Sequence, residues 1–162
     1  MKEEVIELDT VDKYNKFFGV ETYHPMVTVV DLSKITQPAQ PFTINYGIYA
    51  LFLKDTLCGD ITYGRQPYDY QEGTIVCFAP GQVASIHAQE GTRPSGYGLL
   101  FHPDFIRGTQ LGHDIRNYSF FSYEAREALH LSEEERHTVI DCLHKIDTEL
   151  RRPADKHSRR LI

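Results

Sequence analysis

Histidine side chains are the first candidates for chemistry in this sequence, because an imidazole can carry a proton or bind a metal ion near neutral pH. His130, His137 and His144 recur every seven residues and would therefore lie along one side of a helix. We interpret this row as a solvated flank, not as a zinc site or a proton sensor. His87 is the only histidine in an expected barrel strand, where a structural role and a ligand contact are both compatible with its type.

Covalent catalysis is not indicated by any sequence motif. The chain contains no G-x-S-x-G nucleophile elbow, no P-loop, and no G-x-G-x-x-G turn that opens a helix. Asp69 and His87 could in principle form an acid–base pair, but nothing in the sequence brings them together. We therefore expect no catalytic residues and no cofactor.

Tyrosines are frequent where we expect strands, and each offers an apolar ring and one hydroxyl group. This combination suits a pocket for a small aromatic or sugar-like ligand. A domain that lacks tryptophan also needs tyrosine to fill its core, so both interpretations stay open. From the alternation of side chains along strands we expect an internal ligand site lined by Tyr46, Ile48, Tyr63, Phe78 and His87.

The bulk composition is that of one globular domain. At 162 residues, with 41% hydrophobic and 25% charged residues, the chain can form one core and is short for two domains. It has no apolar run near the ~20 residues of a membrane span, and its acidic start lacks a signal sequence. The three cysteines include no C-x-x-C pair, so we expect a reducing cytoplasm and no disulfide framework.

The net charge of -6 argues against direct binding of nucleic acid by this chain. Seven acidic and seven basic side chains follow Leu131 and cancel each other, so the whole excess of negative charge lies in residues 1–130. Such an acidic body would repel a phosphate backbone.

Strands dominate the expected secondary structure and lie between helical segments. Residues 10–18 predict a short helix, with Thr10 as its N-cap and Gly19 as its C-terminal stop. From residue 42 to residue 101, β-branched and aromatic runs alternate with Gly and Pro turns, which predicts a sandwich or a small barrel. After that, a helical turn is expected from Pro103, and residues 112–124 predict an irregular aromatic stretch.

The clearest helix is expected from residue 131 to residue 152. Ser132 and Glu135 form a capping box at its start, and Pro153 ends it. Its apolar stripe can pack on the strands of the same chain, on a second copy of the chain, or on both. As candidate dimer contacts we name Val139, Ile140, Leu143, Ile146 and Leu150.

Residues 73–88 resemble the second sequence motif of the cupin family, G-x5-P-x-G-x2-H-x3-N. Gly73 is kept and the proline is displaced by one residue, to Pro80, but alanines stand at the histidine and asparagine positions, Ala84 and Ala88. Upstream, FTINYG occupies the place of the H-x-H motif and contains no histidine. The resemblance implies a mainly β fold, with a cupin-like (double-stranded β-helix or jelly-roll) barrel that binds no metal, a short N-terminal helix and C-terminal helices.

The later part of the chain resembles AraC-type transcription regulators of bacteria. Three segments carry the likeness: FHPDFI at residues 101–106, FFSY at 120–123 and EALHLSEEE at 127–135. The resemblance implies a regulatory domain that forms a homodimer and binds a small effector, with sugars and aromatic compounds as the candidates. It also implies that promoter DNA is bound only by a helix-turn-helix domain beyond Ile162, where residues 158–162 look like the start of a further helix.

This resemblance divides the chain into four parts: an N-terminal arm with a short helix at 1–24, the barrel at 25–104, a helical dimerisation segment at 105–152, and the start of a linker at 153–162. One alternative is an enzyme on a cupin scaffold, such as a sugar isomerase, an epimerase or a dioxygenase. Another is a stand-alone small-molecule-binding barrel. The metal ligands that such an enzyme needs are absent from the sequence motifs, and we expect no membrane partner.

Overall fold

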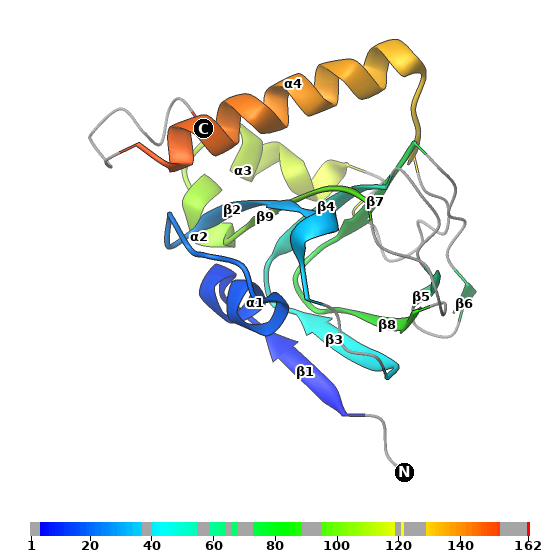
Figure 1. The fold of residues 1–162 in the computed structure, drawn as a ribbon. Coiled ribbons are helices and arrows are strands. Elements are labelled where there is room, and N and C mark those ends of the chain that lie inside the picture. Colours follow the sequence, from blue (N-terminus) through cyan, green and yellow to red (C-terminus); the bar gives the residue numbers. More distant parts are fainter. Residues whose placement is uncertain are drawn as a thin grey trace.

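Two β-sheets that lie face to face form the body of the protein, in a computed structural model that describes residues 4–36, 40–54, 59–63, 66–67, 73–88, 95–118, 121, 129–152 and 162 (Figure 1). The first sheet has the strand order β1 (Val5–Leu8), β3 (Phe42–Tyr46), β8 (Gln82–Ala88), β5 (Gly59–Tyr63) and β6 (Gln66–Pro67). The second sheet has the order β10 (Leu129–His130), β7 (Thr74–Phe78), β4 (Tyr49–Lys54), β9 (Gly96–Phe101) and β2 (Val27–Asp31).

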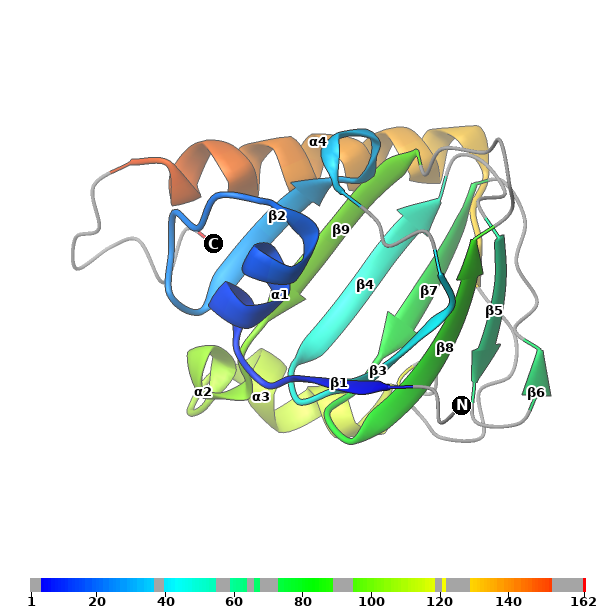
Figure 2. The same cartoon turned by 60° about the horizontal axis from the view of Figure 1, so that its bottom comes forward.

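Successive strands alternate between the two sheets along most of the chain. β2, β4, β7 and β9 lie in the second sheet, whereas β3, β5 and β8 lie in the first. The expected mainly β class is confirmed. The described strands do not form a closed barrel, however, because no ladder of hydrogen bonds joins the two sheets and helix α1 (Val11–Phe18) lies between their edge strands β1 and β2 (Figure 2).

Strand side chains point alternately into two hydrophobic cores. Along β4, Ala50 and Phe52 belong to an inner core between the sheets, whereas Leu51 and Leu53 belong to an outer core on the far face of the second sheet. Because both faces of the second sheet are covered, its strands are apolar at consecutive positions.

The N-terminal segment contributes one strand and one helix to the described structure. Thr10 caps α1 by accepting a hydrogen bond from the Lys13 N–H at 3.1 Å, and Gly19 ends it in the left-handed region at φ 71°, as predicted. β1, which we did not predict, pairs in parallel with β3. Val11, Tyr14 and Phe18 pack from α1 into the inner core.

Helix α4 (Glu133–Leu150) runs along the outer face of the second sheet (Figure 1). The predicted capping box is confirmed, since Ser132 Oγ accepts from the Glu135 N–H at 3.2 Å and the Glu135 carboxylate accepts from the Ser132 N–H at 2.8 Å. Four shorter elements complete the described structure: η1 (Leu32–Lys34), α2 (Pro103–Ile106), α3 (Gln110–Asp114) and η2 (Ile115–Asn117). Of these, α2 confirms the helical turn, and α3 overlaps the stretch that we expected to be irregular.

Candidate functional site

Three of the residues that we expected at an internal ligand site lie between the two sheets. Tyr46, Ile48 and Phe78 belong to the inner core, and none is more than 2% exposed. The Tyr46 ring, from the first sheet, stacks on the Phe78 ring, from the second, with centroids 4.7 Å apart and planes 15° apart. The interior at this point is therefore a wall of packed aromatic rings.

The other two expected residues, Tyr63 and His87, are placed by their strands only. Tyr63 lies opposite Ala84 where β5 pairs with β8, and His87 lies opposite Asp60 in the same ladder. Their side chains are outside the part of the chain that the structure describes, so their contact with a ligand stays a prediction.

The two segments compared above with the cupin metal motifs are neighbours in the first sheet. FTINY forms β3 and QVASIHA forms β8, and the two strands pair so that Ile44 lies opposite Ala84. Both side chains are completely buried in the inner core. An isoleucine and an alanine have no donor atom for a metal ion, so this position between the two strands is apolar. Within the described ranges, no group of three or more His, Cys, Asp or Glu side chains gathers in a metal-binding arrangement.

Two phenol groups interrupt the apolar character of the inner core. Tyr14 from α1 and Tyr46 from β3 are both fully buried, and burial raises the pKa of each hydroxyl above its ordinary value. A further contribution from Tyr46 raises the pKa of Tyr14, which means that the two hydroxyls influence each other. Both phenols are therefore neutral at physiological pH and can exchange hydrogen bonds with a polar group between the sheets.

At one end of the inner face of the second sheet lies a row with two polar residues, Lys54 and Thr74, which the sequence did not lead us to predict there. Across strands β9, β4 and β7, the inward positions form three rows: Leu100–Ala50–Phe78, Gly98–Phe52–Val76 and Gly96–Lys54–Thr74. Lys54 is only 9% exposed, and Thr74 is completely buried. The Lys54 ammonium lies 5.5 Å from the centroid of the Phe52 ring, in the range of a cation–π contact. Strand alternation in YALFLK puts Lys54 on the same face as Ala50 and Phe52, but alternation alone does not say that a lysine at the end of a strand is buried.

The predicted apolar stripe of α4 packs mainly on its own chain. Leu143 and Leu150 are buried, and Val139, Ile140 and Ile146 are partly buried against the outer core or its margin. Of the alternatives left open by the sequence, packing within the chain holds for Leu143 and Leu150. The partly exposed margins leave room for a contact with a second copy, which stays a prediction.

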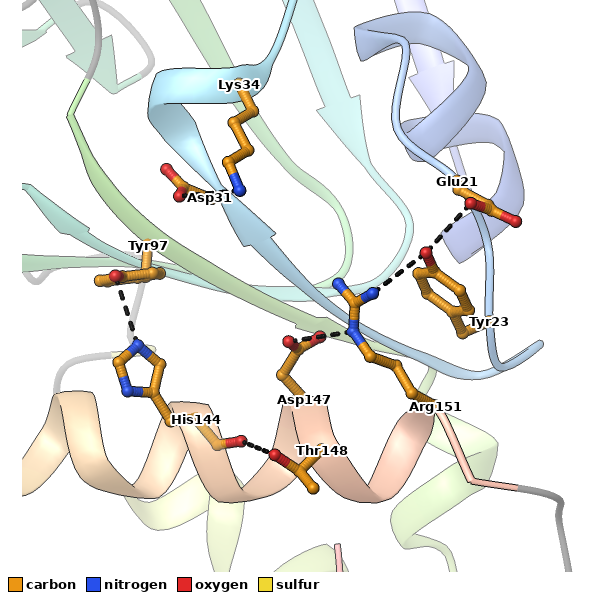
Figure 3. A network of polar contacts seen from close by, with 9 residues as sticks. All are labelled: Glu21, Tyr23, Asp31, Lys34, Tyr97, His144, Asp147, Thr148 and Arg151. Atoms are coloured by element: carbon orange, nitrogen blue, oxygen red, sulfur yellow. Dashed lines mark hydrogen bonds and ion pairs between the residues drawn. The ribbon is translucent and has the colours of Figure 1, made fainter.

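A cleft of about 340 Å³ lies beside the C-terminal half of α4 (Figure 3). We name it the α4 cleft, and its lining residues are Val20, Glu21, Tyr23, Val29, Asp31, Lys34, Tyr97, His144, Asp147 and Arg151. They come from the segment after α1, from β2 and η1, from β9, and from α4 and its C-cap. The cleft thus joins the N-terminal segment to the last helix.

Arg151 is the centre of the polar contacts in the α4 cleft (Figure 3). Its guanidinium donates to Asp147 at 3.2 Å and to the Tyr23 hydroxyl at 3.1 Å, and it lies 4.4 Å from the centroid of the Tyr23 ring. The nearby Asp147 carboxylate raises the pKa of Arg151. Tyr23 in turn donates to Glu21 at 3.0 Å. Through these hydrogen bonds, the polar groups of the cleft connect the C-terminal end of α4 with residues 21–23.

The histidine row is broken by the fold. His130 lies in β10, and only His137 and His144 are on α4. His144 Nε2 lies 3.3 Å from the Tyr97 hydroxyl, and His137 is an exposed residue 3.7 Å from Glu133. These contacts fit a solvated flank of α4 that has one polar contact with β9, between His144 and Tyr97.

The described part of the chain contains no helix that is both long and apolar enough to cross a membrane. In comparisons with known proteins, no family model and no curated protein matches the chain.

Proposed function

We propose that this chain is the effector-sensing and dimerising domain of an AraC-type transcription regulator, with a cupin-like, jelly-roll arrangement of its two sheets. The observation that carries the proposal is the pairing of Ile44 with Ala84. The two segments compared with the cupin motifs lie on neighbouring strands, and apolar residues stand there where that family has metal-binding histidines. A scaffold of this kind is suited to binding and not to metal-assisted catalysis.

The cupin-like arrangement is supported by the path of the chain. Successive strands pass from one facing sheet to the other, which is characteristic of double-sheet jelly rolls. A ligand that enters between the sheets would contact the inner faces of β3, β4, β7 and β8. There the aromatic wall of Tyr46 and Phe78 offers apolar surface, and the phenols of Tyr14 and Tyr46 offer polar groups.

The proposed mechanism is a population shift that passes from the inner core to α4. Tyr14 and Phe18 pack α1 on the inner core, and Asn15, also in α1, donates to Thr22 at 3.1 Å. The next residue, Tyr23, contacts Arg151 at the end of α4. An effector that favours one position of α1 would thereby favour one position of the α4 end.

Homodimer formation is proposed through the margin of α4. Val139 and Ile146 are only partly buried by their own chain, and Cys142 lies beside both because three and four residues separate them along the helix. A two-fold contact at this margin would pair the α4 helices of two copies, and α4 is the helix that precedes the residues leading to Ile162. DNA binding would belong to the region beyond Ile162, because the excess acidic charge of residues 1–130 opposes it here.

The experiment that tests the proposed function is to determine the reading frame of the source gene beyond Ile162. Two helix-turn-helix units after the linker, and promoter binding by the full-length protein in a mobility-shift assay, would support a regulator. A stop codon within a few residues would overturn it and leave a stand-alone binding domain or an enzyme.

A further inference from the structure

The α4 cleft is lined by charged groups of both signs. Three carboxylates, those of Glu21, Asp31 and Asp147, line it together with two cations, those of Lys34 and Arg151. A ligand with only a negative charge would meet more carboxylates than cations, and a ligand with only a positive charge would leave both cations without an anion. Electrostatic complementarity therefore favours a ligand that carries one group of each sign.

On the α4 side of the cleft, Arg151 is held in place and still has N–H groups for a ligand (Figure 3). Asp147 accepts from its Nε at 3.2 Å, the Tyr23 hydroxyl accepts from its Nη1 at 3.1 Å, and the guanidinium lies 4.4 Å from the centroid of the Tyr23 ring. A guanidinium has five N–H groups, and among the described residues Arg151 donates with only these two. The others can form charge-assisted hydrogen bonds to a carboxylate.

Across the cleft, at the end of β2, Asp31 is a fixed acceptor. Its Oδ1 accepts from the Ser33 N–H at 3.0 Å and from the Ser33 hydroxyl at 2.6 Å. Its Oδ2 lies 3.9 Å from Lys34 Nζ, which is longer than a hydrogen bond. An ammonium group in the cleft can therefore donate to Oδ2, while the Lys34 side chain, which is 81% exposed, can reach a carboxylate beside it.

The α4 cleft also has apolar surface. Val29 lies on the same face of β2 as Asp31, and Tyr97 lies opposite Asp31 where β2 pairs with β9. The Tyr97 ring is set edge to face against the His144 ring, with centroids 5.3 Å apart and planes 88° apart. The volume of about 340 Å³ is at the lower end of the range of small-molecule sites, so it suits a small ligand.

We propose that the α4 cleft binds a free α-amino acid with an apolar side chain. Its carboxylate accepts from Arg151 and Lys34, its ammonium donates to Asp31 Oδ2, and its side chain packs on Val29 and Tyr97. This site goes beyond the proposed function, because it lies outside the space between the two sheets and requires no DNA-binding region. A bound amino acid would link the C-terminal end of α4 to β2 and η1.

The test removes one charged group of the ligand at a time. L-phenylalanine is compared with hydrocinnamate, which lacks the ammonium, and with phenethylamine, which lacks the carboxylate; L-leucine, isocaproate and isoamylamine form a second series. Binding to the 162-residue chain is measured by saturation-transfer NMR titration at neutral pH. We expect each amino acid to bind at least about tenfold more tightly than either of its analogues. Equal binding within both series, or no binding of either amino acid, would overturn the inference.

Two variants assign the charged groups of the site. Arg151→Gln should weaken binding of L-phenylalanine at least about tenfold and leave phenethylamine unaffected. Asp31→Asn, in which the amide oxygen can still accept from Ser33, should weaken L-phenylalanine similarly and leave hydrocinnamate unaffected. The matched controls Arg152→Gln and Asp141→Asn change exposed residues that do not line the α4 cleft, and both should bind as the wild type does. Binding of L-phenylalanine that survives both Arg151→Gln and Asp31→Asn would overturn the inference.

Backbone amide chemical shifts locate the ligand independently of the variants. L-phenylalanine should shift the amide signals of Val29 and Tyr97, which line the α4 cleft, more than those of Ala50 and Val76 in the inner core. Shifts confined to the inner core would overturn the inference and support the ligand site of the proposed function. An amino acid bound in the α4 cleft of a protein whose gene encodes no DNA-binding region would keep the inference and remove the regulator.

Discussion

At the scale of single residues, the two buried phenols make the fold sensitive to alkaline pH. Burial raises the pKa of Tyr14 and Tyr46 in the folded protein, so the unfolded chain loses these protons at a lower pH than the folded chain does. Above the ordinary tyrosine pKa of about 10, the unfolded state therefore binds fewer protons, and the free energy of unfolding falls as the pH rises. We expect Tyr46→Phe to lose less of this free energy than the wild type between neutral pH and about pH 11, as measured by urea denaturation.

The matched control for this prediction is Tyr23→Phe, which removes the hydroxyl of an exposed tyrosine. It should follow the wild-type decrease across the same pH interval. If Tyr46→Phe also follows the wild type, burial of the Tyr46 phenol does not cause the decrease in the free energy of unfolding at high pH.

Residue types and strand alternation predicted part of the interior. Alternation placed Tyr46 and Phe78 inside, and the structure puts both in the inner core. Lys54 could not be chosen in the same way, because a lysine followed by Asp55 at a strand end is typical of an exposed position. Its burial depends on the register of β4 with β7 and β9, which is a long-range property that no local pattern contains.

At the scale of elements, local signals predicted helices better than strand pairing. The caps of α1 and α4 are hydrogen bonds between residues three apart, so the sequence contains both partners. β1 has no such local signal, since it is stabilised by pairing with β3, which lies more than thirty residues later. The polar contact of Arg151 with Tyr23 could not be predicted either, because the two residues are far apart along the chain.

Anchoring of α4 on the second sheet gives a prediction at the element scale. Leu143→Ala removes a side chain of α4 that is buried by the rest of the chain, and it should lower the free energy of unfolding by about 2–5 kcal/mol. Lys145→Ala, two residues later on the exposed side of the same helix, should change it by about 0.5 kcal/mol or less. Urea denaturation of both variants measures the difference. Equal stabilities would contradict packing of the α4 stripe on its own sheet.

At the scale of the whole molecule, the second sheet connects the proposed ligand site with the proposed dimer contact. Its inner face lines the inner core and its outer face packs against α4, so the two sites are separated by one layer of strands. A second connection runs around the edge of the sheet, from α1 through Thr22 and Tyr23 to Arg151. A change in packing between the sheets therefore has two short routes to the surface where a second copy would bind.

The dimer can be tested with a cysteine that the protein already has. Cys142 is exposed and lies near the middle of α4, so a two-fold helix pair that crosses at its centre would bring the two Cys142 thiols together. Cys77 should not react at neutral pH, because it is buried and burial raises its pKa to about 12. In a Cys58→Ser background, we expect a short bismaleimide to cross-link the protein into covalent dimers, as measured by denaturing gel electrophoresis.

The position of the thiol on α4 separates a specific dimer from random collision. Cys142→Ser should abolish the cross-link, and adding Thr148→Cys to that variant should not restore it, because Thr148 is exposed on another side of the helix, away from Val139 and Ile146. Equal cross-linking from both positions would indicate collision alone. Monomers in every variant, with a monomeric mass by light scattering, would contradict pairing through this margin of α4 and would leave the helix with a purely intramolecular role.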